Sequence, residues 1–511
     1  MTSNTSIHSG RWWEKDGQKI QCNLCPRHCR IKPGNRGFCF VRKATTTGIE
    51  LTTYGRSSGF CIDPIEKKPL NHFFPGSSVL SFGTAGCNLA CKFCQNWDIS
   101  KSKEMDKLMQ LASPEVIARA ANQLGCSSVA FTYNDPVIFA EYAIDVANAC
   151  RELGIHSVAV TAGYITEEAR SEFFNSMDAT NVDLKAFTKQ FYRNLCGSDI
   201  EPVKETLKYL VHETNIWVEL TNLIIPGEND NEKELRELSK WIRDELTPTV
   251  PIHFTAYHPA YKLSNPRTPT QTLLNAQKIA LEEGLEFVYT GNVHNKSGES
   301  TYCPNCGNLL IGRNRYELSE WSFAKESPGV CPKCEREIPG HFNSSPGTWG
   351  QKRVPIDIAN FTSSFNNNDL KRNKEDNLNG YINNLDKKNC EIVKRAIREP
   401  AVAGIFYSEN TKSLFETLSN LFSASLPKAE AGNPKALIVP HAGYMYSGQI
   451  AANAFSNWIN EKDLIENVVI IGPSHRVLFD GIAIPKMNIF KTPLGEVSLK
   501  NSFIEQLKNL P

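Results

Sequence analysis

Short apolar runs alternate with amphipathic patterns of helical period between residues 76 and 292. Such runs predict strands, and the amphipathic patterns predict helices. The predicted strands are residues 78–83, 128–133, 157–162, 179–185, 216–223, 252–257 and 286–290. The predicted helices are residues 137–153, 231–246 and 270–283, with one more starting after Ser113, an N-cap residue followed by Pro114.

The repetition of strand and helix predicts an α/β fold with a parallel sheet. Crossover connections between parallel strands are right-handed, so a succession of them winds in one sense. With about six such units, the pattern predicts an incomplete TIM-like (β/α)6 barrel. Ligands of such barrels bind at the C-terminal ends of the strands. Polar or metal-binding residues just after a strand are therefore the first candidates for a functional site.

The segments on either side of this core lack its regular alternation. Residues 361–389 are rich in Asn, Lys, Asp and Ser and predict a flexible linker. A new apolar pattern begins at residue 398 and predicts strands at 436–439 and 468–471. The predicted organisation is a Cys-rich N-terminal region (1–75), the core (76–292), a four-cysteine module (293–340), a linker (341–397) and a last domain (398–511).

Length and composition agree with several domains in one chain. At about 150 residues per domain, 511 residues predict roughly three domains. The net charge of +1, from 56 basic and 55 acidic residues, indicates neither a nucleic acid nor a membrane surface as partner. No apolar run is long enough for a transmembrane helix, and the polar start predicts no secretory signal. The 16 cysteines cluster at metal-ligand spacing, which predicts a reducing, cytoplasmic setting rather than a disulfide scaffold.

One cysteine cluster follows the first predicted core strand. Cys87, Cys91 and Cys94 stand at C-x3-C-x2-C. A cubane iron–sulfur cluster normally takes four Cys ligands, so three leave one iron open for chemistry. The alternatives are a zinc knuckle or three ordinary buried thiols.

Polar side chains also follow two later strands. Asn134 and Asp135 lie after the second strand, where they form either part of a ligand site or a capped turn before the next helix. Asp183 and Lys185 are two residues apart and therefore share one face of a strand. They either pair with each other or face a ligand, because unpaired buried charges are costly. His253, on a later strand, is more typical of a core residue than of a catalyst.

The C-x3-C-x2-C loop resembles the signature of the radical S-adenosylmethionine (SAM) superfamily. The resemblance implies a [4Fe–4S] cluster on Cys87, Cys91 and Cys94, with SAM chelating the open iron. It also implies reductive cleavage of SAM to a 5′-deoxyadenosyl radical that abstracts hydrogen. Thr-Tyr-Asn-Asp-Pro at 132–136 is similar to a Thr-Tyr-x-Glu-Pro form of the SAM-binding motif, with Asp135 in place of Glu.

Further segments sharpen this resemblance over roughly residues 15–355. Asp183-Leu184-Lys185 also occurs in activating enzymes of glycyl radical proteins, which implies that Asn134, Asp135, Asp183 and Lys185 help to bind SAM. The segments Cys-x2-Cys-Pro-x2-Cys, 63–70, 223–227, 253–259 and 289–293 together resemble the radical SAM enzyme of the AmmeMemoRadiSam system.

The family resemblance implies partners but no settled substrate. A reduced flavodoxin or ferredoxin would supply the electron, and the hydrogen would come from a partner protein of that system or from a small molecule. The competing interpretation is a non-enzymatic metal-binding scaffold that assembles Memo-like and associated proteins. SAM turnover discriminates between the two.

Two other cysteine sets have metal-ligand spacing. Cys22, Cys25, Cys29 and Cys39 stand at C-x2-C-x3-C-x9-C, which leaves an iron–sulfur cluster, zinc or no metal open. Two C-P-x-C knuckles predict a structural zinc ribbon, with a rubredoxin-like iron site as the alternative. These knuckles hold Cys303, Cys306, Cys331 and Cys334. The remaining cysteines are expected to be ordinary core or surface thiols: Cys61, Cys126, Cys150, Cys196 and Cys390.

Residues 398–511 resemble the start of a Memo-like domain, the AmmeMemoRadiSam system protein B. Memo-like proteins share a fold with extradiol dioxygenases that use non-haem iron. By position, His441 and His475 match two metal ligands of that family, and a third would fall beyond Pro511. The resemblance therefore implies a truncated domain, in which the two histidines form a weak metal site or are inert turn residues.

Overall fold

The computed structural model describes residues 8–101, 110–362, 397–404, 406–425, 434, 436–461, 465, 468–472, 487 and 489–499. The chain divides into two compact units, Met1–Asn379 and Gly380–Pro511. Within the described part, no helix has both the length and the apolar character needed to cross a membrane.

A nine-stranded sheet forms the centre of the first unit, in the order β16-β15-β14-β13-β12-β11-β9-β8-β20. The strands from β9 to β16 are all parallel and neighbour one another in chain order. They are β9 (Ser78–Phe82), β11 (Ser128–Phe131), β12 (His156–Thr161), β13 (Ala179–Asp183), β14 (Trp217–Ile224), β15 (Ile252–Ala256) and β16 (Val288–Gly291). The predicted parallel sheet is confirmed strand by strand, whereas its closure into a partial barrel stays a prediction.

Two antiparallel strands extend this sheet at one edge. β8 (Phe60–Pro64) pairs with β9, and β20 (Val354–Ile356) pairs with β8. β20 falls within residues 341–397, which the sequence predicts as linker. The first part of that range instead packs on the fold, because Ile356 is buried and the backbone of β20 continues the sheet. Residues 363–396 of the predicted linker lie outside the described residues.

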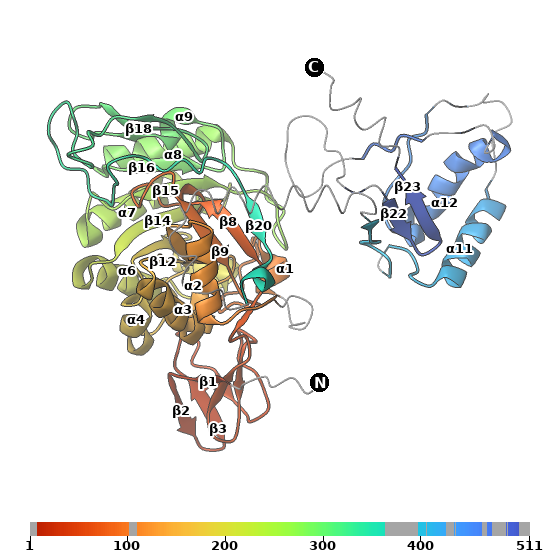
Figure 1. The fold of residues 1–511 in the computed structure, drawn as a ribbon, viewed down its shortest axis with the longest axis horizontal. Helices are drawn as coiled ribbons and strands as arrows, with labels where there is room; N and C mark the ends of the chain where they lie inside the picture. Colours follow the sequence, from red (N-terminus) through yellow and green to blue (C-terminus); the bar gives the residue numbers. More distant parts are fainter. Residues whose placement is uncertain are drawn as a thin grey trace. The chain divides into compact units, whose positions relative to one another are not determined.

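The predicted helices pack along the sheet (Figure 1). They are α2 (Pro114–Gln123), α3 (Ala140–Glu152), α7 (Glu232–Trp241) and α8 (Thr270–Glu282), with α4 (Glu167–Phe174) and α6 (Glu201–Glu213) between them. Ser113 caps α2 as predicted, accepting a hydrogen bond from the Val116 backbone N–H. Before α3 the chain makes a 3-10 turn, η3 (Pro136–Phe139), so the predicted helix begins irregularly.

The segment between β8 and β9 covers the start of the parallel strands. Ile65, Leu70 and Phe73 from this segment pack against Val79 of β9 and Ala130 of β11. The backbone N–H of His72 donates to Glu219 at 2.7 Å, and His253 lies 2.6 Å from the same carboxylate. Each of these buried polar groups has a partner, so His253 is a satisfied core residue.

A small N-terminal module precedes the sheet, and Figure 1 shows β1 (His8–Gly10), β2 (Trp13–Asp16) and β3 (Lys19–Cys22) grouped there. Both Glu141 oxygens, on α3, accept hydrogen bonds from Arg42 at 2.9 Å. This ion pair is buried, so removing one partner would leave an uncompensated charge. The pair therefore ties the module to the sheet's helical layer.

The second unit has a small sheet and two longer helices. The sheet consists of β21 (Ile397–Arg398), β22 (Ile489–Thr492) and β23 (Gly495–Ser498). The helices α11 (Thr411–Ser423) and α12 (Tyr444–Phe455) contact each other.

The strands predicted at 436–439 and 468–471 are wrong. Both segments are described, and both are irregular and largely exposed, with Ile438 and Ile471 at 100% and 91% exposure. A strand needs neighbours that complete its backbone hydrogen bonds, and no described segment pairs with either run. Apolar composition alone therefore does not produce a strand here.

Candidate functional site

The three predicted cluster cysteines lie on a loop that follows β9, at the C-terminal edge of the parallel strands. Ligands of open α/β sheets bind at that edge. Cys91 is buried, and Cys87 and Cys94 are partly exposed. The loop between β9 and residue 96 contains no helix or strand, so contacts with other segments must hold it in place.

A π-helical turn, η4 (Tyr192–Cys196), supports the loop through its backbone. The N–H groups of Ala90 and Lys92 donate to the carbonyls of Cys196 and Leu195, both at 2.8 Å. These two bonds attach the loop to η4 on both sides of Cys91. They fix the backbone of Cys91 between two anchored residues.

Gly86 allows the cysteine loop to approach the N-terminal module closely. Its φ of +86° lies in the left-handed region, and a Cβ there would overlap the carbonyl oxygen of Cys39. Strain and overlap both disfavour a side chain at this position. The loop conformation thus depends on this glycine.

Gly86→Ala is expected to destabilise the protein by more than the ~1–2 kcal/mol of left-handed strain alone, and to reduce iron loading. Gly154→Ala is the matched control, because Gly154 has a φ of +66° but open space around its Cβ position. Denaturant unfolding and iron content after reconstitution measure both effects. Equal behaviour of the two variants would show that the contact with Cys39 does not matter.

Asn134 holds the start of the cysteine loop. Its side-chain NH2 donates to the Gly86 carbonyl at 2.9 Å and to the Thr84 hydroxyl at 3.2 Å. Its side-chain oxygen accepts from the Thr84 backbone N–H at 3.0 Å. Both N–H donors of the buried amide are therefore used within the protein. Asn134 positions the cluster loop, and its predicted contact with SAM stays a prediction.

Asp135 forms the capped turn that the sequence offered as one alternative. Its carboxylate accepts hydrogen bonds from the Val137 backbone N–H at 3.1 Å, the Thr161 hydroxyl at 2.9 Å and the Ala162 N–H at 3.1 Å. Burial raises the pKa of this carboxyl, and the three donors oppose that rise. The group joins the ends of β11 and β12, and a SAM contact in addition stays a prediction.

Asp183 and Lys185 form an ion pair, with 2.8 Å between Nζ and Oδ2. Lys185 is 13% exposed and Asp183 35% exposed, so the pair borders solvent at the edge where β13 ends. Burial disfavours the ammonium, but Asp183 holds the pKa of Lys185 well above its ordinary value. Cys91 and Cys196 interact electrostatically with the same ammonium. The predicted pair therefore lies beside a predicted cluster ligand.

Two lysines, Lys101 and Lys185, bring positive charge to the cysteine loop. Lys101 also donates to the Leu89 carbonyl at 2.6 Å. Burial raises the pKa of Cys87, to about 12, and of Cys94, and the charge of Lys101 opposes both rises. A set of thiolates in this position needs such cations nearby, because isolated buried anions are costly. The donors and charges present fit an iron–sulfur cluster.

Cys196 is a neighbour of the site that the sequence did not single out. A hydrogen bond with Cys196 holds the pKa of Cys91 below its ordinary range. The sequence predicts Cys196 to be an ordinary core or surface thiol; it is fully buried, and it lies beside a predicted cluster ligand. Its position beside Cys91 results from the packing of η4 against the loop, and nothing in the local sequence predicts it.

Arg27 is a second residue that sequence reasoning missed. It lies between Cys25 and Cys29 and donates to the Asn88 carbonyl and, at 2.6 Å, to the Gly197 carbonyl. The N-terminal cysteine loop thereby contacts both the cluster loop and the residue after η4. Cys22, Cys25, Cys29 and Cys39 all line one small cavity in this region.

The structure brings the four cysteines of the C-P-x-C knuckles together. The Sγ atoms of Cys303, Cys306, Cys331 and Cys334 all lie within 4.8 Å of one another. They stand next to β18 (Leu309–Asn314) and β19 (Glu317–Trp321), over an apolar cluster that includes Phe287 and Ile311. The hydrogen bond of Asn305 with Cys334 lowers the pKa of that thiol to about 6, which favours metal ligation.

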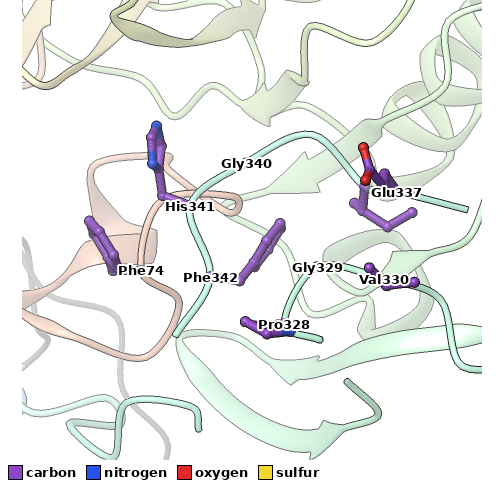
Figure 2. A pocket seen from close by; sticks show the side chains of 9 residues that line it. Phe74, Pro328, Gly329, Val330, Glu337, Gly340, His341 and Phe342 are labelled. Carbon is purple, nitrogen blue, oxygen red and sulfur yellow. The ribbon is translucent and has the colours of Figure 1, made fainter. Parts of the chain in front are cut away.

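A cavity lies between this module and the segment before β9 (Figure 2). It is lined by Phe74, Pro328, Gly329, Val330, Glu337, Ile338, Gly340, His341 and Phe342. None of the predicted site residues lines it, and its volume is about 330 Å³. The cavity is a groove of the module and not part of the cluster site.

The histidines of the second unit are only partly described. His441 precedes α12 and does not follow a strand, and His475 lies outside the described residues. The predicted pairing of His441 with His475 therefore involves a residue outside the described part of the chain and stays a prediction.

We expect His441→Ala to leave the metal content of the full chain unchanged, because two imidazoles alone hold a metal weakly. Metal analysis of both proteins after equal exposure to iron measures this, with Lys412→Ala as an exposed control on the same unit. A loss of one metal ion per chain in His441→Ala alone would contradict the expectation.

Two family models match the chain. The model described as Radical SAM superfamily matches residues 82–239, and the model described as Memo-like protein matches residues 398–511. The uncharacterized protein MJ0808 of Methanocaldococcus jannaschii is 43% identical over 309 residues, 60% of this chain and 92% of that protein. The radical SAM match includes the cysteine loop, Asn134, Asp135, Asp183 and Lys185.

Other relatives resemble one part of the chain each. The pyruvate formate-lyase 1-activating enzyme of Escherichia coli K12 is 25% identical over 224 residues, 41% of this chain and 90% of that enzyme. The MEMO1 family protein MJ0403 of M. jannaschii is 36% identical over 119 residues, 22% of this chain. The chain spans only 41% of the length of that MEMO1 relative.

Among solved structures, a domain of pyruvate-formate lyase-activating enzyme from Bacteroides vulgatus is 20% identical. It covers 32% of this chain and 99% of its own, with a TM-score of 0.29. A score this low supports no conclusion about function.

Proposed function

This chain belongs to the radical SAM superfamily through residues 82–239 and carries a Memo-like domain at residues 398–511, and we propose that it cleaves SAM reductively to abstract hydrogen from a substrate. The observation that carries the proposal is the placement of Cys87, Cys91 and Cys94 at the C-terminal edge of the parallel strands, beside Asp183 and Lys185. Thiol ligands, cations and an adjacent polar pair thus stand at one edge of the sheet.

Each residue of the site has a proposed task. Cys87, Cys91 and Cys94 hold a [4Fe–4S] cluster, and Lys101 offsets the charge of the thiolates. When bound, the cluster supplies one electron for cleavage of SAM to methionine and a 5′-deoxyadenosyl radical. Asn134 and Asp135 fix the loop and the neighbouring strand ends, and Lys185 offers its ammonium to the SAM carboxylate.

The partners follow from the chemistry and from the relatives. An electron must enter from a reductant, and a reduced flavodoxin or ferredoxin fits that need. The likeness to an activating enzyme at 25% identity favours a protein as the source of hydrogen, ahead of a small molecule. The alternative is a metal-binding scaffold without turnover, which the extra cysteine sets and the Memo-like domain favour.

Anaerobic reconstitution with iron and sulfide, followed by dithionite and SAM, tests the proposal. We expect release of 5′-deoxyadenosine and methionine, which chromatography with mass detection measures. A fully iron-loaded protein that releases neither product would reject the enzyme and leave the scaffold.

Lys185→Met is expected to weaken SAM binding by about 1–3 kcal/mol, roughly a 5- to 150-fold rise in Kd, because a charge-assisted hydrogen bond is lost. Lys189→Met is the matched control, since Lys189 lies nearby in sequence, is 57% exposed and pairs with Glu201. Anaerobic calorimetry measures both. Unchanged SAM affinity in a folded Lys185→Met protein would show that the ion pair is only structural.

A further inference from the structure

We propose that Cys22, Cys25, Cys29 and Cys39 bind a second iron–sulfur cluster of the cubane type, packed directly against the loop of the first. The N-terminal site is thereby an iron site and differs in kind from the C-P-x-C module. This second site is separate from SAM cleavage. It rests on the proposed function only in that it would lie beside the cysteine loop that holds the first cluster.

The four thiols converge on one enclosed cavity. The Cys22 N–H donates to the Cys29 carbonyl at 2.9 Å, and the His28 N–H donates to the Cys25 carbonyl at 3.1 Å. These bonds fold the segment between β3 and β4 (Arg30–Ile31) into a tight loop, and Cys39 joins the same cavity from beyond β4. None of the four is in a disulfide, although all four line the same small space. A shared metal centre explains that arrangement.

The spacing of the sulfur atoms separates zinc from a cluster. A zinc ion bound tetrahedrally at about 2.3 Å needs Sγ atoms only ~3.8 Å apart. The C-P-x-C cysteines meet that condition, with all Sγ atoms within 4.8 Å. In the described part of the chain no other three cysteines do so, and this includes both the N-terminal set and Cys87, Cys91 and Cys94. A cubane spreads its ligands over different irons and therefore suits the wider spacing.

The walls of the cavity also suit a cluster. Leu24, Ile31, Val137 and Ile138 give an apolar lining, and Arg27 and Arg42 bring positive charge. Arg42 is already paired with Glu141, so its position is fixed before any metal binds. Apolar packing with nearby cations is what a four-thiolate anion requires when it is buried.

The N-terminal cysteine segment contacts the loop that carries Cys87, Cys91 and Cys94. Arg27, from between two of the proposed ligands, donates to the carbonyls of Asn88 and Gly197. The Cys39 carbonyl lies so close to Gly86 that no side chain fits between them. A metal centre that orders Cys25, Cys29 and Cys39 therefore also orders the neighbours of Cys87.

The test uses the full chain with Cys87, Cys91 and Cys94 all changed to alanine, reconstituted anaerobically with iron and sulfide. We expect about four irons and four sulfides per chain to remain, with the Mössbauer spectrum of a cubane, in addition to the zinc of the C-P-x-C module. A further Cys25→Ser, Cys29→Ser change should remove this iron and keep the zinc. Cys126→Ser in place of these two changes is the control for loss of a buried thiol.

Two results would overturn the proposal. The first is a second zinc per chain and no iron in the variant without the catalytic cysteines. The second is a variant that is folded by circular dichroism but holds no metal at the N-terminal site. Because the readout is metal content and spectrum, it stands apart from 5′-deoxyadenosine release by the unaltered protein. Failure of SAM cleavage alone would leave the second cluster in place.

Discussion

Cys91→Ala is expected to abolish 5′-deoxyadenosine formation while the protein stays folded. Cys91 is the most buried of the three cluster cysteines, and its neighbours Ala90 and Lys92 are both bonded to η4. Loss of its thiolate leaves two ligands, too few to hold a cubane on this loop. The rate of product release after anaerobic reconstitution measures the effect, which should exceed a thousandfold, about 4 kcal/mol in barrier terms.

Two matched variants show whether the loss is specific to cluster ligation. Cys126→Ala removes a buried thiol at a distance from the loop in sequence and is expected to retain product formation. Cys196→Ala removes the thiol that hydrogen-bonds Cys91 and is expected to retain the cluster, since Cys196 is not in the C-x3-C-x2-C set. SAM cleavage by Cys91→Ala at the unaltered rate would refute the assignment of the loop.

The parallel strands could be predicted because each is fixed by its own sequence. The seven parallel strands of the sheet are short, mostly apolar runs between turns and helices, because most of their residues are buried on both faces. β8 and β20 could not be predicted in the same way. β20 is only three residues long, and its pairing with β8 joins segments almost 300 residues apart. Such pairing depends on the completed sheet and not on a local pattern.

The two strands predicted in the second unit were wrong because their local pattern had no neighbouring strand to pair with in the described part of the chain. The runs at 436–439 and 468–471 have the right composition, but a strand exists only as part of a sheet. The exposed Ile438 and Ile471 show that burial is missing where the pattern predicted it. Local apolarity gives a tendency, and only neighbouring strands convert it into structure.

The candidate site also has residues that local sequence spacing predicts and residues that only tertiary packing places. Cys87, Cys91 and Cys94, and the C-P-x-C cysteines, could be found because ligands on one tight loop have a fixed spacing. Asp183 and Lys185 could be found as a pair from their spacing, although β13 ends at Asp183 and Lys185 lies just beyond the strand. Cys196, Arg27 and Lys101 could not, because each reaches the cluster loop through tertiary packing. Nothing in the local sequence of Cys196 distinguishes it from Cys150 or Cys126.

The three cysteine sets also differ in what surrounds them. The cluster loop is open at the edge of the sheet, beside an ion pair that borders solvent. The C-P-x-C cysteines are packed on an apolar cluster, and their close spacing suits one metal ion held by all four thiols. Closed four-thiolate ligation is typical of structural zinc, and an open position is typical of catalysis. We therefore expect cysteine to serve a catalytic site at the loop and a structural site in the C-P-x-C module.

Cys331→Ser is expected to remove zinc from the protein and to unfold the C-P-x-C module while leaving the parallel sheet intact. Structural zinc sites contribute roughly 10–16 kcal/mol of apparent binding free energy, far more than a module of this size gains from its own core. Cys331 is fully buried and lies 3.6 Å from Cys306 between the Sγ atoms, so serine cannot replace it as a soft ligand.

Zinc analysis and hydrogen exchange measure the two effects separately. Protein purified without added iron should contain about one zinc per chain, and Cys331→Ser should contain none. Exchange should rise in β18 and β19 and stay unchanged in β11 and β12, which are remote in the sheet order from the module. Cys150→Ser serves as the control for a buried thiol outside the module. Absence of zinc in the unaltered protein would refute the site, and iron in its place would identify the rubredoxin-like alternative.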